Sequence, residues 1–167
     1  MKRLCCPWRI KYITSPKTNK CVFCENIKEN TDEKNLILLR GKYCFIMLNL
    51  YPYNNGHLMI IPYAHKANLT QLSQEEYDEM MFLAQVSIEA LQRVMNPHGF
   101  NLGMNIGNSA GAGIADHVHL HVVPRWEGDS NFMLVIGDTK VIPEDLPSTY
   151  KKLYPVVREI YEEKKKS

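Results

Sequence analysis

Histidines and aliphatic residues alternate along the stretch 117–122 of the chain. His117, His119 and His121 take every second position, and the residues between and after them are Val118, Leu120 and Val122. A period of two is typical of a β-strand, so we expect the three imidazoles on one face and the aliphatic side chains on the other. Each strand residue advances the chain by ~3.3 Å, which predicts successive rings about 6.5–7 Å apart.

Four further stretches have the apolar, β-branched character of strands. Turn residues bound them, including a Gly41-Lys42 pair expected to close a hairpin, and they cover residues 35–40, 43–49, 57–62 and 100–106. The last is expected to pair with the histidine strand. Residues 132–136 are strand-like as well.

Two stretches have the three- and four-residue spacing of helices. The first begins at a capping box of Ser73 and Glu76 and ends at Asn96-Pro97. Its apolar positions are expected to face the core or a dimer partner; they are Tyr77, Met80, Met81, Ala84, Ile88, Leu91 and Met95. The second carries Leu153, Val157 and Ile160 on one stripe, and Pro155 either starts or interrupts it.

These elements predict an α+β fold in which a mostly antiparallel sheet of about five strands carries one long helix and a C-terminal helix. A chain of 167 residues is large enough for one domain with its own core. We expect an N-terminal arm over 1–31, a core over 32–145 and the final helix over 146–167.

Charge and hydropathy limit the kinds of partner that the protein is expected to bind. The chain has 20 basic and 18 acidic residues, a net charge of +2, which implies no general attraction to a nucleic acid polymer or a membrane. No apolar run approaches the ~18 residues needed to cross a bilayer, and the N-terminus lacks a signal-peptide core. We therefore expect a cytoplasmic protein whose anion binding is local.

Five cysteines, an odd number, argue against a disulfide framework. Cys21 and Cys24 form a CxxC knuckle, which lets two thiolates reach one tetrahedral Zn²⁺. Such a site needs two more ligands, for which His65 and His117 are candidates. Two free buried thiols and a redox pair remain alternatives. Cys5, Cys6 and Cys44 have no partner pattern and are assigned to the arm or the core.

A loop of small residues from Asn105 to Gly113 precedes the histidines. Such a loop lets backbone N–H groups approach an anion such as phosphate. A row of imidazoles can ligate a metal, act as nucleophile or acid/base, or lie in a polar groove. Because half of the chain's six histidines follow this loop in register, the chemical roles are favoured over the groove.

The stretch 117–123, with its Gly-rich approach and the following Pro124-Arg125, resembles the signature of the histidine triad (HIT) superfamily of nucleotide hydrolases and nucleotidyl transferases. The longer run from Asn105 to Met133 is similar to the small diadenosine tetraphosphate phosphorylases and their HIT hydrolase relatives. The likeness extends from about Pro7 to Leu153. It implies a HIT fold, a homodimer and a mono- or dinucleotide substrate, with diadenosine tetraphosphate expected.

The resemblance also implies a role for each histidine. His119 would attack the α-phosphate to give a nucleotidyl-histidine, and His121 would contact the phosphate or the leaving group. His117 would orient its neighbours or hold the metal, and these two roles compete. His57 would lie behind the triad and help to set its tautomers; the alternative is a core histidine with satisfied hydrogen bonds.

By the same resemblance, Zn²⁺ would be bound by Cys21, Cys24, His65 and His117. The expected substrate-binding residues come from the pocket segment, the Gly-rich loop and the segment after the triad. Asn49 would bind the ribose, and the remainder are Asn105, Ser109, Gly111, Gly113 and Trp126.

The acceptor of the nucleotidyl group stays open between orthophosphate and water. The phosphorylase pattern has a Gly-Ser pair where this chain has Ala112-Gly113, so a hydroxyl that would hold orthophosphate is missing. The rival interpretations are a nucleoside phosphoramidate hydrolase, a nucleotide-binding or sensor module without turnover, and a purely structural zinc module.

Overall fold

The computed structural model describes residues 20–129 and 141–166. Most of the N-terminal arm, Cys5, Cys6 and the strand-like stretch 132–136 lie outside the described residues. No helix in the described ranges is long and apolar enough to cross a bilayer.

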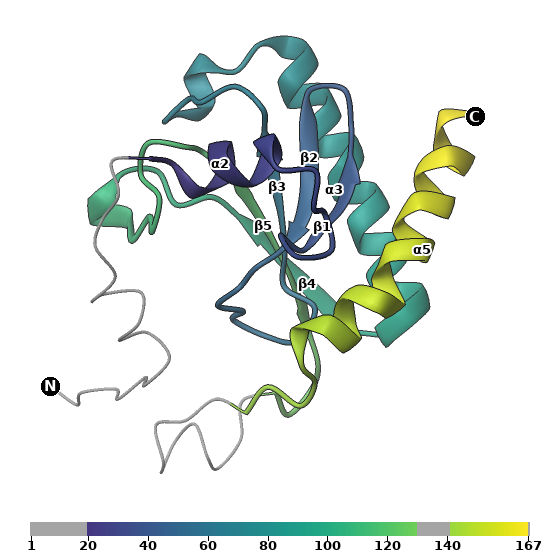
Figure 1. Ribbon diagram of the computed structural model, residues 1–167. Helices are drawn as coiled ribbons and strands as arrows, with labels where there is room; N and C mark the ends of the chain where they lie inside the picture. The colour runs from purple at the N-terminus through teal and green to yellow at the C-terminus, as the bar shows by residue number, and fades with distance from the viewer. Residues whose placement is uncertain (1–19, 130–140, 167) are drawn as a thin grey trace, which may run out of the picture.

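The described chain builds one antiparallel sheet of five strands in the order β1-β2-β3-β5-β4 (Figure 1). The strands are β1 (Ile37–Arg40), β2 (Cys44–Leu48), β3 (Leu58–Pro62), β4 (Gly99–Gly103) and β5 (Leu120–Arg125). The predicted hairpin joins β1 to β2, and β4 pairs with the histidine strand as expected. The predicted α+β fold is confirmed.

The histidine stretch departs from the regular strand that its alternation predicts. β5 begins only at Leu120, because the Val118 N–H donates to the Lys66 carbonyl at 2.7 Å, outside the sheet ladder. The His119 and His121 ring centroids are 4.7 Å apart. The expectation of three evenly spaced rings on one strand, 6.5–7 Å apart, is therefore wrong.

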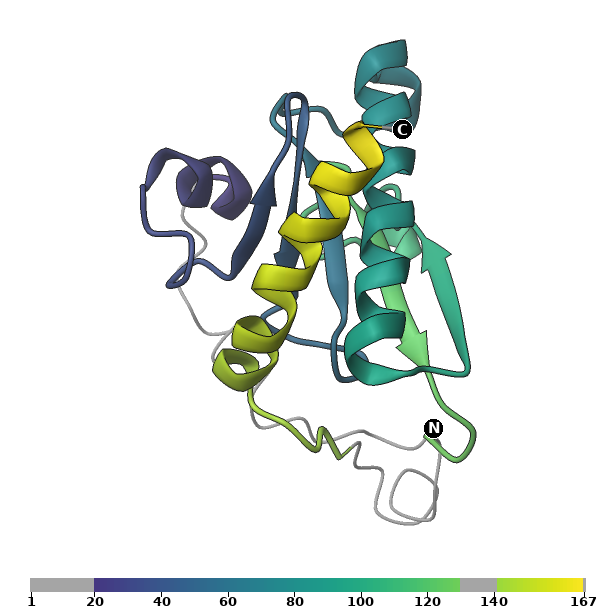
Figure 2. The same ribbon diagram turned by 90° about the vertical axis from the view of Figure 1, so that its right-hand side faces the viewer.

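The long helix is α3 (Gln74–Met95), and both halves of its predicted capping box are formed. It ends at Asn96, which is left-handed at φ 45°. Of the predicted apolar stripe, Met80, Ala84 and Leu91 are buried in the core, whereas Tyr77 and Met81 are 42% and 39% exposed, so for these two only the predicted contact with a dimer partner stays open. Because α3 packs against both the sheet and α5 (Leu146–Lys165) (Figure 2), its buried face extends to Leu83, Val86 and Ala90, which the stripe omitted.

Pro155 neither starts nor ends the final helix. Asp145 caps α5 ten residues earlier by accepting the Ser148 N–H at 2.9 Å. Pro155 lies inside the helix on its exposed side, so the carbonyl that loses its helical partner faces solvent. The three apolar residues predicted on the buried stripe are all inside the core: Leu153, Val157 and Ile160.

The helices divide between the two faces of the sheet. α3 and α5 cover one face, and the short α2 (Val22–Lys28) lies on the other side (Figure 1). Phe23 of α2 packs against the strand residues of that second face, which are Ile37, Phe45, Met47, Met59 and Ile61. Met59 pairs with His121 in the ladder between β3 and β5, which places His121 on the α2 side as well.

Gly56 allows the turn before β3 to lie close against the C-terminal end of α3. Its φ is +73°, and a Cβ there would meet the Met95 sulfur at 2.7 Å. Only glycine fits both the backbone conformation and this approach. The next residue is His57, so the fit of this turn sets where that imidazole enters the sheet.

Candidate functional site

Two histidines from neighbouring strands form a buried pair. His57 precedes β3, His121 lies in β5, and the His57 Nε2 and His121 Nδ1 atoms are 2.9 Å apart. The Tyr53 backbone N–H donates to His57 Nδ1 at 3.0 Å. His57 therefore carries its proton on Nε2 and donates it to His121 Nδ1, which leaves the His121 proton on Nε2.

The Nε2–H of His121 is buried and has no hydrogen-bond partner among the described residues. An unpaired buried donor costs roughly 1–3 kcal/mol, so native proteins usually provide it with a ligand or a water. Since His121 is only 8% exposed, this donor marks a place where an acceptor is expected to bind.

His119 has the opposite tautomer. Its Nδ1 lies 2.9 Å from the His117 carbonyl oxygen. A carbonyl oxygen only accepts, so Nδ1 carries the proton and Nε2 keeps its lone pair. No hydrogen bond within the described ranges reaches that Nε2. A bare imidazole nitrogen beside the His121 ring is equipped to attack an electrophile or to accept a proton.

His117 turns away from this pair towards the cysteines. Its Nε2–H donates to the Pro62 carbonyl at 2.8 Å, which leaves Nδ1 with a lone pair. That Nδ1 lies 3.3 Å from Cys21 Sγ and 3.6 Å from Cys24 Sγ. Cys24 Sγ is also 3.4 Å from His65 Nδ1.

The spacing of these four ligand atoms fits a tetrahedral ion. They all lie within 4.8 Å of one another, and they belong to Cys21, Cys24, His65 and His117. Bonds of about 2.0–2.3 Å around a tetrahedral Zn²⁺ separate neighbouring ligands by roughly 3.3–3.8 Å, which brackets the three distances above. The set that the sequence suggested for a metal is thus brought together, and two thiols with two imidazoles suit zinc.

Burial keeps the imidazoles neutral. It lowers the pKa of His57 to about 3 and that of His121 to about 4, with a smaller contribution from the neighbouring histidines. Burial lowers the pKa of His119 as well, although its bond to the His117 carbonyl opposes this. Neutral rings are required for the tautomers assigned above, because a protonated imidazole has no lone pair.

The Gly-rich loop leaves the sheet beside the histidines, because Gly103 at the end of β4 pairs with His121. Gly107 and Gly111 have φ of +82° and +83°, which lets the loop fold into a short 3-10 turn. The N–H groups of Ala110, Gly111 and Ala112 donate to carbonyls inside the loop. Fewer of its donors are therefore available to a phosphate than its composition suggested.

Most of the other candidate binding residues lie in this loop. Ser109, Gly111 and Gly113 are exposed, while Asn105 is half-buried. Asn49 accepts the Tyr51 N–H at 2.9 Å, and its amide nitrogen is 3.4 Å from His57 Nδ1. This places it next to the histidine pair.

Polar residues that the sequence analysis did not identify connect two segments of the site through hydrogen bonds. The buried amide of Asn54 donates to the Pro124 carbonyl at 3.0 Å and to Asp129 at 2.9 Å. Asp129 also forms a two-pronged ion pair with Arg125 at 2.6 and 2.9 Å. These bonds connect the turn before His57 to the end of β5, where Trp126 lies half-buried. No local motif indicates such contacts between distant segments.

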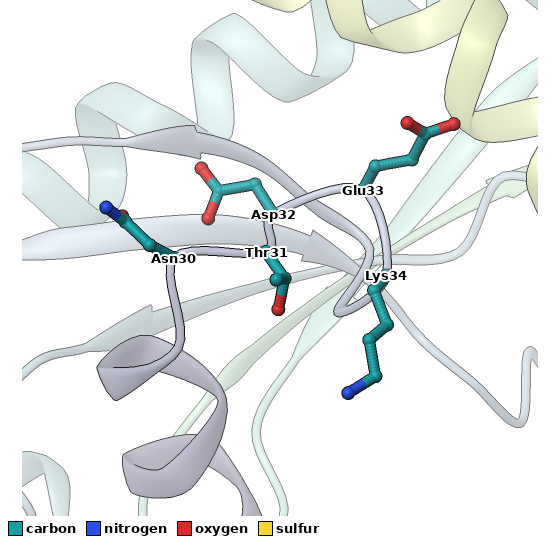
Figure 3. A pocket seen from close by; sticks show the side chains of 5 residues that line it. All are labelled: Asn30, Thr31, Asp32, Glu33 and Lys34. Atoms are coloured by element: carbon teal, nitrogen blue, oxygen red, sulfur yellow. The ribbon is translucent and has the colours of Figure 1, made fainter.

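A surface hollow lies elsewhere, on the connection from α2 to β1 (Figure 3). Five consecutive residues line it, Asn30 to Lys34, none of which is a histidine or cysteine. Asp32 accepts from Arg40 Nε and Nη2 at 3.0 and 2.8 Å, so its carboxylate is engaged in holding the connection. We assign no chemistry to this hollow.

Comparison with known proteins identifies the family. The HIT domain profile matches residues 30–128. The chain is 42% identical over 162 residues to an AP-4-A phosphorylase from Mycobacterium tuberculosis, covering 92% of this chain and 83% of that protein. The chain belongs to the HIT family. It is a HIT-family nucleotide-processing enzyme.

Other HIT relatives show the range of the family. The adenosine 5'-monophosphoramidase HNT1 of Saccharomyces cerevisiae is 32% identical over 117 residues, covering 70% of this chain and 68% of that protein. Among solved structures, a zinc-bound histidine triad family protein from Mycobacterium smegmatis superposes with a TM-score of 0.69. It is 25% identical and covers 86% of this chain and 96% of its own.

The buried histidine pair predicts that acid destabilises this HIT protein. An unfolded histidine takes up a proton near its ordinary pKa of 6.5, whereas folded His57 and His121, with pKa values of about 3 and 4, stay neutral. Below about pH 6.5 the unfolded state therefore binds more protons, and the stability present above that pH is progressively lost.

His57→Asn removes one of these groups and should reduce the pH dependence of the free energy of unfolding by up to about 1.4 kcal/mol per pH unit. Urea unfolding at several values between about pH 7 and pH 5 measures it, a window that stays above the titration of most carboxylates. Equal slopes for the wild type and the variant would contradict the assignment.

Proposed function

We propose that this HIT enzyme transfers a nucleotidyl group from a dinucleoside polyphosphate, with diadenosine tetraphosphate as the expected substrate, through a nucleotidyl-histidine intermediate. The observation that carries the proposal is the tautomer of His119. Its Nδ1–H is fixed on the His117 carbonyl, so a neutral, bare Nε2 is available for attack. The 42% identity to a protein named AP-4-A phosphorylase supports the substrate class.

In the first step His119 Nε2 attacks the α-phosphorus. An N–P bond forms, the P–O bond to the rest of the polyphosphate breaks, and ATP leaves as an anion. The positive charge that develops on the His119 ring is stabilised because its Nδ1–H already donates to a carbonyl oxygen. The unpaired Nε2–H of His121 would donate to the phosphate or to the leaving oxygen.

In the second step an oxygen of the acceptor attacks phosphorus, the N–P bond breaks, and the lone pair returns to His119 Nε2. Orthophosphate as acceptor gives ADP, and water gives AMP with a proton released to solvent. His57 keeps His121 in the tautomer that donates, through the 2.9 Å bond between them. We assign His57 and His121 to the catalytic machinery on this ground.

We assign His117 to the metal cluster and not to proton transfer. Both of its ring nitrogens are committed, Nε2 to the Pro62 carbonyl and Nδ1 to the two thiols. Zn²⁺ held by Cys21, Cys24, His65 and His117 would have four protein ligands and no open position, so it would cross-link the fold and leave the reaction to the histidines.

Substrate binding is proposed for the residues around the Gly-rich loop and the pocket turn. Asn49 would bind the ribose beside the histidine pair, and Trp126 would contact the nucleotide from the end of β5. Phosphate contacts are proposed for the half-buried Asn105, the exposed Ser109 and the backbone of Gly113, whereas Gly111, whose N–H donates to the Asn108 carbonyl, is proposed to shape the loop through its left-handed turn.

Product analysis tests the reaction. The purified protein should convert diadenosine tetraphosphate to ADP and ATP if orthophosphate is the acceptor, or to AMP and ATP regardless of added orthophosphate if water is. His119→Ala should lower turnover by at least roughly 10³-fold with folding intact, because the nucleophile is lost. His98→Ala, which removes an exposed histidine outside the triad, is the matched control.

Retained turnover in His119→Ala would refute the mechanism. A second candidate, hydrolysis of a nucleoside phosphoramidate, is favoured by the likeness to the yeast monophosphoramidase. It keeps the same histidine chemistry and predicts release of AMP from an adenosine phosphoramidate but no products from diadenosine tetraphosphate. Nucleotide binding without any turnover would instead support a sensor module.

Zinc is expected at one ion per chain in the purified protein. Cys24→Ser should lose the ion, because it replaces one of the two thiolates, whereas Cys44→Ser should keep it, because Cys44 is buried on the α3 side of the sheet. Elemental analysis after dialysis measures the content. Equal zinc in the two variants would contradict the proposed ligand set.

We also propose that two copies pair through the sheet edge. Among the described residues β4 is an end strand, so no strand there pairs with its outer edge. Leu102 in β4 and Ile106 in the loop after it are 42% and 38% exposed. Light scattering should give twice the 19.3 kDa chain mass, and Leu102→Asp should give the chain mass itself. Val141→Asp, at another exposed apolar position, should remain dimeric. A monomeric wild type would refute this assembly.

A further inference from the structure

Phe23 lies at the junction between the metal-binding cluster and the reacting histidines. In sequence it stands between Cys21 and Cys24, and in space its ring packs edge-on against two imidazoles. The centroid distance is 5.5 Å to His117, at 90°, and 5.1 Å to His119, at 67°. The side chain is 3% exposed, so these contacts are inside the protein.

The helix that carries Phe23 depends on outside support. α2 has seven residues, far fewer than an isolated helix needs to be stable in water. Its N-cap residue Cys21 makes no side-chain capping bond to the helix. The contacts that fix its first turn are the approach of both thiols to His117 and the packing of Phe23 into the second face of the sheet.

The ring of His119 is 5% exposed and takes part in one hydrogen bond and two aromatic contacts. One hydrogen bond, from Nδ1 to the His117 carbonyl, constrains one edge but permits rotation about the bond axis. Its aromatic contacts among the described residues are with His121, at 4.7 Å between the ring centroids, and with Phe23. Phe23 therefore limits how far the His119 ring can tilt and where Nε2 points.

We propose that Phe23 is a positioning residue that couples occupancy of the cysteine–histidine metal cluster to the orientation of the His119 imidazole. This inference rests on the proposed role of His119 as nucleophile. When both thiolates are held next to His117, the first turn of α2 is fixed. Phe23 then packs against the His119 ring and limits its rotation. With the cluster open, that turn loosens and Phe23 no longer supports the ring, so the His119 ring rotates and its Nδ1–H loses the alignment with the His117 carbonyl that fixes its tautomer and direction.

The proposed coupling predicts a change in kcat and little change in KM. The aromatic contacts of Phe23 are with the two imidazoles, so loss of its ring should affect the reacting nitrogen and leave nucleotide binding in place. We expect Phe23→Met to lower kcat by about 10- to 10²-fold, since a misplacement of about 1 Å costs that much, with little change in KM.

Histidine side-chain ¹⁵N NMR tests the coupling without requiring turnover. In the zinc-loaded wild type, His119 should show one tautomer, with the proton on Nδ1. After removal of zinc by a chelator its two nitrogens should become averaged. Phe23→Met should retain zinc but already show averaged His119 signals, with no further change on chelation.

Phe45→Met is the matched control. Phe45 belongs to the same apolar cluster and is fully buried, but its ring packs against Tyr63 at 5.5 Å and not against a triad histidine. It should lose comparable packing and keep the wild-type His119 signals together with their response to chelation.

Two results would overturn the coupling. One is a wild-type His119 tautomer that survives removal of zinc, and this arm needs no variant to fold. The other is a Phe23→Met protein whose His119 responds to chelation as the wild type does. Failure of the proposed function is separable, because a nucleotidyl group found on another residue would leave these NMR results unchanged.

Discussion

A backbone carbonyl accepts hydrogen bonds and cannot donate them, and this asymmetry determines the chemistry of the site. The His117 carbonyl takes the Nδ1 proton of His119, and the Pro62 carbonyl takes the Nε2 proton of His117. Each bond frees the opposite nitrogen. His119 thereby presents a bare Nε2 beside His121, while His117 presents a bare Nδ1 to the two thiols.

The fold supplies these constraints from one face of the sheet. The two long helices occupy the other face and form the larger apolar core, which leaves the α2 side for the histidines, the cysteines and Phe23. Burial on that side lowers the pKa of the imidazoles, so the tautomers remain defined at neutral pH. In the mechanism that we propose, the three histidines of the signature divide between two tasks, one at the cysteine–histidine cluster and two at the phosphate.

The sequence was most informative where the signal is local. The capping box at Ser73 and Glu76 depends on residues three apart, and the strands depend on alternation, so both could be predicted. The CxxC knuckle and the HIT resemblance named all four members of the metal cluster, which the structure brings together.

The features that were missed or wrong depend on contacts between distant segments. His117 and His119 lie outside β5 because the Val118 N–H donates to the Lys66 carbonyl, more than fifty residues earlier in the chain. The hydrophobic periodicity of the sequence gives no indication of that hydrogen bond. Asn54 reaches Asp129 across a similar separation. Phe23 lies between two candidate ligands in the sequence, and that position could have marked it as a candidate. Its contact with His119 could be recognised only in the folded structure.

The central claim is that His119 Nε2 carries the nucleotidyl group. Rapid acid-free quenching of the enzyme with diadenosine tetraphosphate, followed by peptide mass spectrometry, tests it most directly. We predict one nucleotidyl adduct per active chain, on the peptide 117–125 and located at His119. An adduct on a different residue, or product formation with no adduct at any time, would contradict the account.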